Sequence, residues 1–131
     1  MEEKFKIQII TPEKIVFNNE TEMATLPCYE GNMGILKNHI PIITFLKPGI
    51  VKIKKNNDSY DSFFVEDGIV EFFNNNLSIL SSTAIDTQNI QRTFLDDLNK
   101  ITEEKLKTNN LSDEERYLLN HKLDTINSIN I

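Results

Sequence analysis

The spacing of the apolar residues changes once along this 131-residue chain, and that change limits the folds open to it. From residue 4 to about residue 80, apolar and polar residues alternate in short runs, as Phe5, Ile7 and Ile9 do. A period of two is typical of strands that bury one face. After residues 81–83 the apolar residues recur at steps of three and four, which indicates amphipathic helices.

Turn residues separate the strand runs at short intervals. These turns are Lys47-Pro48-Gly49, Asn56-Asn57-Asp58, Asp67-Gly68 and Asn74-Asn75-Asn76. Asp67-Gly68 is the strongest hairpin signal among them, and it predicts a hairpin between the runs 60–66 and 69–73. Many short strands with no helices between them predict an antiparallel β-sandwich or barrel.

Strand alternation places most of the later apolar residues in a core, although a ligand-lining aromatic box is the alternative interpretation. The residues concerned are Phe63, Val65, Ile69, Phe72, Phe73, Leu77 and Ile79.

Two helices are expected after the strands. Ile90, Phe94, Leu98 and Ile101 form one apolar stripe on a helix that runs to about Lys107. Ser112 and Glu115 then have the spacing of a capping box, which predicts the start of a second helix with Leu119, Leu123 and Ile126 on one face. The fold class is therefore α+β, with a β-sandwich domain at 1–84 and an antiparallel helical hairpin at 85–131.

Composition excludes several classes of protein. A formal charge of −6 and a pI near 4.9 argue against nucleic-acid binding, which needs clustered Lys and Arg. A single cysteine excludes an intrachain disulfide, and the first residues do not have the pattern of a signal or transit peptide. No apolar stretch approaches the roughly 20 residues that span a bilayer, so we expect membrane association only through partners.

The residues that could carry catalysis or a metal form no convincing constellation. Cys28 and His39 lie in one segment without a third group to orient them, so an enzyme built on this pair is a weak hypothesis. His121 is expected to be exposed and solvated. The acidic run 113–115 fits favourable charge at a helix N-terminus better than a metal site. We therefore expect a non-catalytic chain with no cofactor and no metal.

The glycine-containing segment 26–49 is the most specific motif in the chain. Leu26-Pro27-Cys28 is followed by Glu30-Gly31, by Gly34 with two apolar residues after it, by His39 near Pro41, and by Lys47-Pro48-Gly49. Gly31 and Gly34 predict a tight, shaped loop, because glycine permits positive φ and close approach. The segment and the order of the strands resemble the epsilon subunit of the bacterial F-type ATP synthase, although Cys28 stands where that family usually has Gly.

This resemblance implies a non-catalytic subunit of the central stalk that couples the gamma subunit to the c ring of a proton-translocating complex. The matching loop, 30–39, would contact these partners through Glu30, Gly31, Asn32, Met33, Gly34 and His39. We expect Met33 to be the exposed apolar anchor of this contact. The implied location is the cytoplasmic side of a bacterial inner membrane, as a peripheral protein, although a plastid-encoded relative would also lack a transit peptide.

The resemblance also implies that the helical hairpin can reach the alpha and beta subunits and inhibit ATP hydrolysis. The acidic residues of the second helix outnumber its basic ones, so we expect weak inhibition. Some relatives bind ATP through an Ile-Asp-x-x-Arg-Ala motif, whose match here has Gln91 for the acid and Phe94 for the arginine. ATP binding is therefore not expected, and a stand-alone nucleotide sensor is kept as the alternative function.

Overall fold

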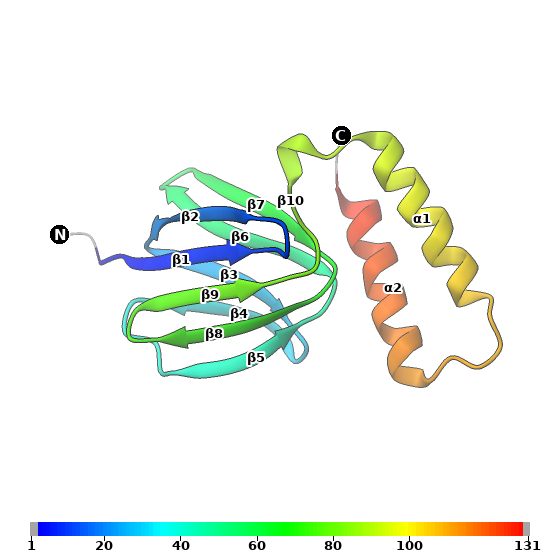
Figure 1. The fold of residues 1–131 in the computed structure, drawn as a ribbon, viewed down its shortest axis with the longest axis horizontal. Coiled ribbons are helices and arrows are strands. Elements are labelled where there is room, and N and C mark those ends of the chain that lie inside the picture. Colours follow the sequence, from blue (N-terminus) through cyan, green and yellow to red (C-terminus); the bar gives the residue numbers. More distant parts are fainter. Residues whose placement is uncertain (1–2, 130–131) are drawn as a thin grey trace.

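The computed structural model describes residues 3–129, which form a strand domain followed by two helices (Figure 1). The strands in this part of the chain are β1 (Phe5–Ile10), β2 (Ile15–Thr21), β3 (Met23–Cys28), β4 (Gly31–Leu36), β5 (Ile42–Leu46), β6 (Gly49–Asn56), β7 (Ser59–Val65), β8 (Gly68–Phe73), β9 (Asn76–Leu80) and β10 (Ala84–Asp86). The 3-10 helix η1 (Thr87–Asn89) leads into α1 (Arg92–Leu106) and α2 (Asp113–Ser128). The predicted fold class is confirmed.

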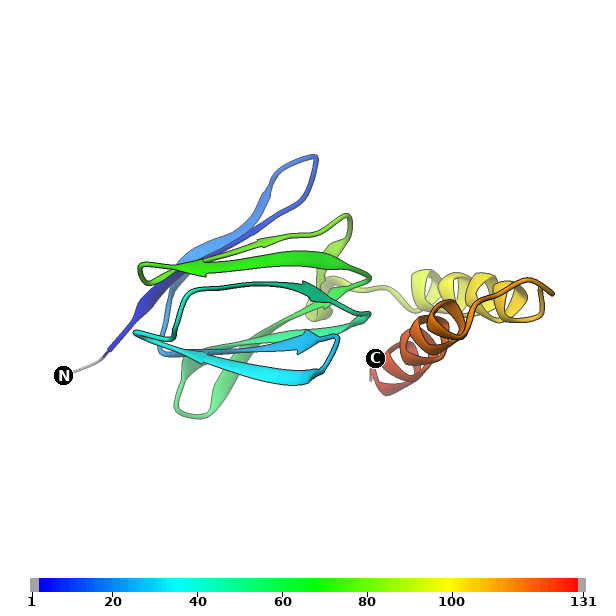
Figure 2. The same cartoon turned by 90° about the horizontal axis from the view of Figure 1, so that it is seen from below.

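The strands form two layers that pack face to face (Figure 2). One layer runs β10-β7-β6-β3 with β4 on the outer side of β3, and the other runs β5-β8-β9-β1-β2. The layers are joined where Cys28 of β3 pairs with Leu46 of β5. This connection makes the sheet continuous around one side of the core, so the sandwich is close to a barrel.

One strand pair departs from the expected antiparallel arrangement. β1 and β9 run parallel, with Ile7 opposite Leu77 and Ile9 opposite Ile79. Parallel neighbours need a long crossover connection, and here almost the whole strand domain lies between the two strands. The pairing ties the first strand of the domain to one of its last.

The predicted hairpin at Asp67-Gly68 is wrong. β7 pairs with β6 and β10, whereas β8 pairs with β5 and β9, so residues 66–67 cross from one layer to the other. Gly68 does not have a positive φ; a Cβ there would lie 2.9 Å from Leu46 Cδ1, so close packing requires the glycine. The tight hairpin instead lies between β8 and β9, where Asn74 and Asn75 have φ of 51° and 59°, as a type I′ turn requires.

The inward faces of both layers form the main core. Its buried apolar residues are Phe5, Ile7, Ile9, Ala24, Leu26, Cys28, Ile35, Leu46, Val51, Ile53, Phe63, Val65, Val70, Phe72, Leu77 and Ile79. The core interpretation is therefore correct for five of the seven residues that the alternation singled out. The other two, Ile69 and Phe73, point outward with 46% and 63% of their surface exposed.

The apolar stripe of α1 is only in part the expected one, because Ile90 and Leu98 face the strand domain and Phe94 and Ile101 do not. Leu95 and Thr102 are buried and Leu98 is partly buried, whereas Phe94 and Ile101 are 36% and 49% exposed. Thr102 can be buried because its hydroxyl donates to the Leu98 carbonyl at 2.7 Å. Leu95 and Thr102 thus take the buried places expected for Phe94 and Ile101.

A second, smaller core attaches the helices to the strand domain. Phe64, Ile90, Leu95 and Ile126 are buried together, and Ile50, Ile85, Leu98 and Ile129 pack against them. Phe64 comes from β7 and faces the helices, while its neighbour Phe63 faces the main core. The two helices form an antiparallel hairpin with α2 nearer to the strands (Figure 1).

The predicted capping box begins α2. The Ser112 hydroxyl accepts from the Glu115 amide at 3.0 Å, and the Glu115 carboxylate accepts from the Ser112 amide at 3.2 Å. Asp113, Glu114 and Glu115 occupy the first turn, where the helix dipole favours negative charge.

Replacing Ser112 by alanine should lower the stability of α2 by about 1 kcal/mol, because one helix amide then loses its acceptor. Native-state amide exchange across α2 would measure this loss. Ser128→Ala makes the same chemical change at the other end of the helix and should have a smaller effect. Equal effects of the two changes would contradict the role assigned to the capping box.

Candidate protein interfaces

The glycine-containing segment forms a β-hairpin, not the loop that the sequence predicts. β3 and β4 pair from Cys28 opposite Gly31 to Met23 opposite Leu36. Gly31 has φ of 132° at the turn, a conformation that side-chain-bearing residues rarely adopt. Gly34 has neither a positive φ nor an atom within 4 Å of an added Cβ, so no contact within the described residues requires a glycine there.

The structure does not bring the six predicted contact residues to one place. Glu30 and Gly31 lie at the turn between β3 and β4, while His39 follows the opposite end of β4. Six residues of strand separate these ends by roughly 20 Å. Asn32 and Gly34 are exposed along β4, between the two ends.

Met33 is not the exposed anchor that the sequence suggested. Its side chain is half-buried and packs against the main core, and Ile35 two residues later is fully buried. Alternation along β4 turns Leu36 outward instead, with 56% of its surface exposed. Leu36 is thus the exposed apolar side chain of this strand.

His39 lies at the base of the connection between β4 and β5. Its ring meets the ring of Phe72 edge to face at 5.8 Å, and Nδ1 lies 2.7 Å from the Ile40 carbonyl oxygen. The neighbouring Asn38 has φ of 66°, and its amide donates to Oδ1 of Asn75 in the β8–β9 turn at 2.7 Å. These contacts hold the connection against the strand domain.

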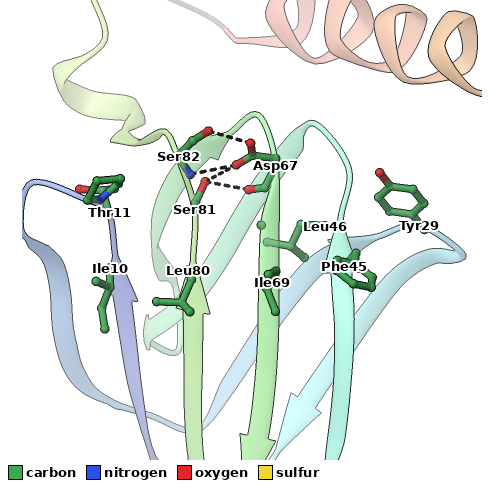
Figure 3. Close-up of a pocket in the computed structure, with 12 residues that line it drawn as sticks. Ile10, Thr11, Tyr29, Phe45, Leu46, Asp67, Ile69, Leu80, Ser81 and Ser82 are labelled. Atoms are coloured by element: carbon green, nitrogen blue, oxygen red, sulfur yellow. Dashed lines mark hydrogen bonds between the residues drawn. The ribbon is translucent and has the colours of Figure 1, made fainter.

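An apolar row that the sequence analysis missed crosses the outer face of the second layer. Cross-strand pairing aligns Phe45 of β5 with Ile69 of β8, Ile69 with Leu80 of β9, and Leu80 with Ile10 of β1. Figure 3 shows these side chains next to one another on the same face of the sheet. Phe45, Ile69 and Leu80 are each about half exposed, at 57%, 46% and 49%. We call these four residues the apolar row.

The apolar row forms the floor of a hollow of about 580 Å³ at the end of the sheet nearest the helices. Tyr29, from the turn between β3 and β4, continues the row beside Phe45; its amide donates to the Phe45 carbonyl at 3.3 Å. The hollow is lined mainly by apolar side chains. Such a surface is suited to packing against another protein.

Asp67 organises the polar rim of the hollow (Figure 3). Its carboxylate accepts hydrogen bonds from the Ser82 hydroxyl at 2.7 Å, the Ser82 amide at 2.9 Å and the Ser81 hydroxyl at 3.2 Å. Burial by itself would raise the pKa of the Asp67 carboxyl, but these hydrogen bonds, with the charge of Lys122, lower the pKa below its ordinary value. The carboxylate thus stays ionised and fixes the turn that follows β9.

The pattern of β5 carries a sequence signal for this surface. Residues 42–46, Ile-Ile-Thr-Phe-Leu, are apolar at both alternating sets of positions, with the single exception of threonine. A strand that buries only one face should show polar residues on the other. Ile43 and Phe45 break that rule and are 70% and 57% exposed.

The structure gives the proposed Cys28 and His39 pair no catalytic geometry. Cys28 is 2% exposed within the main core, whereas His39 lies beyond the far end of β4. Burial raises the pKa of the Cys28 thiol, and the charge of Glu30 raises it further against an opposing effect of Lys47. A protonated, buried thiol is a poor nucleophile.

Residues 3–129 show neither a cluster of metal ligands nor a membrane-spanning helix. These residues contain no group of three or more His, Cys, Asp or Glu side chains placed to hold a metal ion. No helix among them has the length and apolar character needed to cross a membrane.

Cys28 should react with Ellman's reagent only after the chain is unfolded in guanidinium, because the native fold excludes the reagent and keeps the thiol protonated. An Asn110→Cys variant, with its new thiol in the exposed connection between the helices, provides the positive control. Prompt labelling of Cys28 in the native chain would contradict its assignment to the core.

Comparison with known proteins identifies relatives along the whole chain. Residues 4–87 match the model of the family described as ATP synthase, Delta/Epsilon chain, beta-sandwich domain. The ATP synthase epsilon chain of Pelagibacter ubique is 45% identical over 132 residues, covering 99% of this chain and 100% of the relative. The epsilon chain of Rickettsia typhi is 34% identical over 92 residues, covering 69% of this chain and 84% of the relative.

Solved structures share the fold at lower sequence identity. A chain in the mitochondrial ATP synthase of Euglena gracilis has a TM-score of 0.73 at 16% identity, with 97% of this chain and 79% of that chain covered. A chain in the central stalk and c-ring structure of the Tetrahymena thermophila enzyme has a TM-score of 0.68 at 16% identity, with 96% of each covered.

Proposed function

The chain belongs to the ATP synthase delta/epsilon family, and we propose that it is the non-catalytic subunit of the central stalk that couples the gamma subunit to the c ring. Its match to an epsilon chain over the full length of both proteins is the observation that carries this proposal. The relatives named above are subunits of an enzyme complex that makes ATP. This chain likewise contributes binding surfaces to the complex, and bond-making takes place on other subunits.

The gamma subunit binds at the apolar row. Its residues Phe45, Ile69 and Leu80 are exposed and lie opposite one another on neighbouring strands of the outer sheet face. Covering them removes apolar surface from water, and the hollow beside them accepts a protruding side chain of the partner. The rigid sheet beneath the row prevents the two subunits from sliding during rotation.

The c ring is contacted through the hairpin of β3 and β4. Glu30 and Asn32 are exposed near its turn, and the backbone at Gly31 gives that turn its shape. Asn32 offers an amide where an acidic residue is common in the family, so it contributes hydrogen bonds in place of charge. Met33 packs between β4 and the main core, and the lack of a side chain at Gly34 leaves room for the c ring to approach the β4 backbone.

His39 lies apart from both surfaces. It follows β4 at the end away from Glu30, and its ring packs on Phe72, which faces the core at the end of β8 opposite to Ile69. A partner contact at His39 is therefore a separate, third place on the strand domain.

The complex places this subunit at a membrane without inserting it. The chain is a peripheral subunit of a membrane-associated complex. Its bacterial relatives support the finer location, the cytoplasmic side of an inner membrane, where ATP synthesis is coupled to proton transport.

The division into a strand domain at 1–84 and a helical hairpin at 85–131 remains a prediction; its boundary falls within β10.

The helical hairpin inhibits ATP hydrolysis weakly. Lys122, one of the two basic residues of α2, is already paired with Glu66 of the strand domain. The first turn of α2 presents three carboxylates, and these repel acidic loops of alpha or beta subunits.

A stand-alone nucleotide sensor has less support. Gln91 is the N-cap residue of α1 and makes no side-chain capping bond, and Arg92 is directed to Asp96 at 3.6 Å on an exposed part of the helix. Neither residue supplies a prepared site for phosphate.

A Phe45→Glu variant should bind the gamma subunit at least about tenfold more weakly, because a charge would be buried in the centre of an apolar interface. Calorimetry with purified gamma subunit would measure the change. Tyr60→Glu places the same charge at a comparably exposed aromatic position in the other layer and should leave the affinity unchanged. If both variants bind as tightly as the wild type, the apolar row is not the gamma interface.

An Asn32→Cys variant should form a disulfide with a c ring that carries cysteines in its exposed loops, when the assembled enzyme is mildly oxidised. Asn18→Cys, exposed on β2, is the matched control and should not cross-link. If Asn18→Cys cross-links and Asn32→Cys does not, the c ring contacts a different edge of the domain from the one proposed.

A further inference from the structure

Glu71 is the one acidic side chain at the outward positions of β1, β5, β8 and β9, the strands that carry the apolar row. On the basis of the gamma contact proposed above, we propose that this carboxylate forms an ion pair with a basic side chain of the gamma subunit, an arginine or a lysine. The gamma contact then extends from the apolar row across Glu71 to Ile43 and Phe73.

Strand pairing places Glu71 directly beside the apolar row. Ile43 of β5 lies opposite Glu71 of β8, and Glu71 lies opposite Ser78 of β9. Each of these three residues is two positions along its strand from a member of the apolar row, so all of them lie on the same face. Two residues of strand span about 7 Å, so a protein that covers the apolar row lies next to Glu71.

Exposed apolar side chains continue on the far side of Glu71. Ile43 and Phe73 are both mostly exposed, and Phe73 follows Glu71 by two positions on β8. The apolar surface therefore runs from the apolar row to the end of β8, with Glu71 inside it and not at its border. A second hollow, of about 360 Å³, is lined here by Pro41, Ile42, Ile43, Glu71, Phe72 and Phe73.

Glu71 has no partner within the described part of the chain. None of residues 3–129 forms a hydrogen bond or an ion pair with its side chain. Lys6, the other charged residue at the outward positions of these four strands, lies opposite Asn76 and not opposite Glu71. The two acidic residues before β8 differ in this respect, because Glu66 pairs with Lys122 and Asp67 accepts hydrogen bonds from Ser82. The carboxylate of Glu71 is thus free to receive a cation from another protein.

A protein that covers this face must neutralise Glu71. Water solvates the carboxylate in the free chain, but a partner removes that water, and burying an unpaired carboxylate costs more than covering a side chain such as Ile43 gains. A basic side chain of the partner removes most of this cost. Arginine does so best, because its planar group can donate two parallel hydrogen bonds to a carboxylate while its stem lies on apolar neighbours.

Such an ion pair gives the gamma contact a fixed orientation. The attraction between apolar surfaces has no direction, so the apolar row by itself does not determine how the partner is turned. A hydrogen-bonded pair at Glu71 fixes that direction, and the same carboxylate repels an acidic partner surface. A rotor joint needs both properties, because it must transmit rotation without turning within its own interface.

Calorimetry with purified gamma subunit and a full-length Glu71→Leu variant would test the pair through the sign of the effect. If a basic side chain of gamma faces Glu71, leucine leaves that cation buried without its counter-charge, and the dissociation constant should rise at least about tenfold. If gamma covers Glu71 without supplying a cation, leucine removes a buried charge and binding should become tighter. If gamma does not reach Glu71, the affinity should not change. Tighter or unchanged binding would overturn the proposal.

Two controls accompany this measurement. Asp58→Asn removes a negative charge from the exposed turn between β6 and β7, in the other layer, and should leave the affinity unchanged. Glu71→Gln keeps the size of the side chain and should weaken binding in the same direction as Glu71→Leu. Phe45→Glu separates this proposal from the gamma contact itself: if only Phe45→Glu weakens binding, the ion pair alone is refuted, and if neither change does, the contact at this face is refuted with it.

Discussion

The strand domain depends on one constraint: side chains from the two layers must fill a single core while every strand stays hydrogen-bonded along its length. Phe5 of β1 meets Phe72 of β8 edge to face at 5.6 Å, and Phe17 of β2 meets Phe63 of β7 at 5.3 Å across the layers. The junction of β3 with β5 and the parallel pair of β1 with β9 keep the layers in register. A core closed in this way resists shear, because sliding one layer past the other would unpack the contact between Phe17 and Phe63.

Rigidity in this core explains how an outer surface can serve as a coupling element. The apolar row lies directly on strands whose inward residues, such as Val70, Phe72 and Ile79, are fully buried. A force applied to the row passes into the core without a flexible loop between them. The hairpin of β3 and β4 is built in the same way, because Ile35 is buried while its neighbours are exposed. Both surfaces can therefore transmit torque without any reactive group.

Residue spacing was sufficient to predict the order and type of most elements. Alternation identified the strands of the core, and the capping box located the start of α2, because both signals are local. Strand pairing could not be read in the same way: Asp67-Gly68 has the composition of a hairpin turn, yet its glycine is required by the side chain of Leu46. The missing information was a contact between residues far apart in the sequence.

The candidate surfaces were harder to predict for the same reason. Phe45, Ile69 and Leu80 become one row only when three strands pair in the observed register, and the earlier expectation placed Ile69 in the core. His121 was expected to be solvated, but it packs on Tyr117 near a lysine 74 positions earlier in the numbering. Motif resemblance singled out the β3–β4 segment, but it could not show that the residues of this segment separate to opposite ends of a strand.

The most direct test of the central claim is co-purification of the gamma subunit with the full-length chain from cells that express both. If a stiff strand domain presents a binding surface for the rotor, the two proteins should elute together from a size-exclusion column as one stable complex. Elution of this chain by itself, with gamma folded and soluble in the same sample, would contradict that claim.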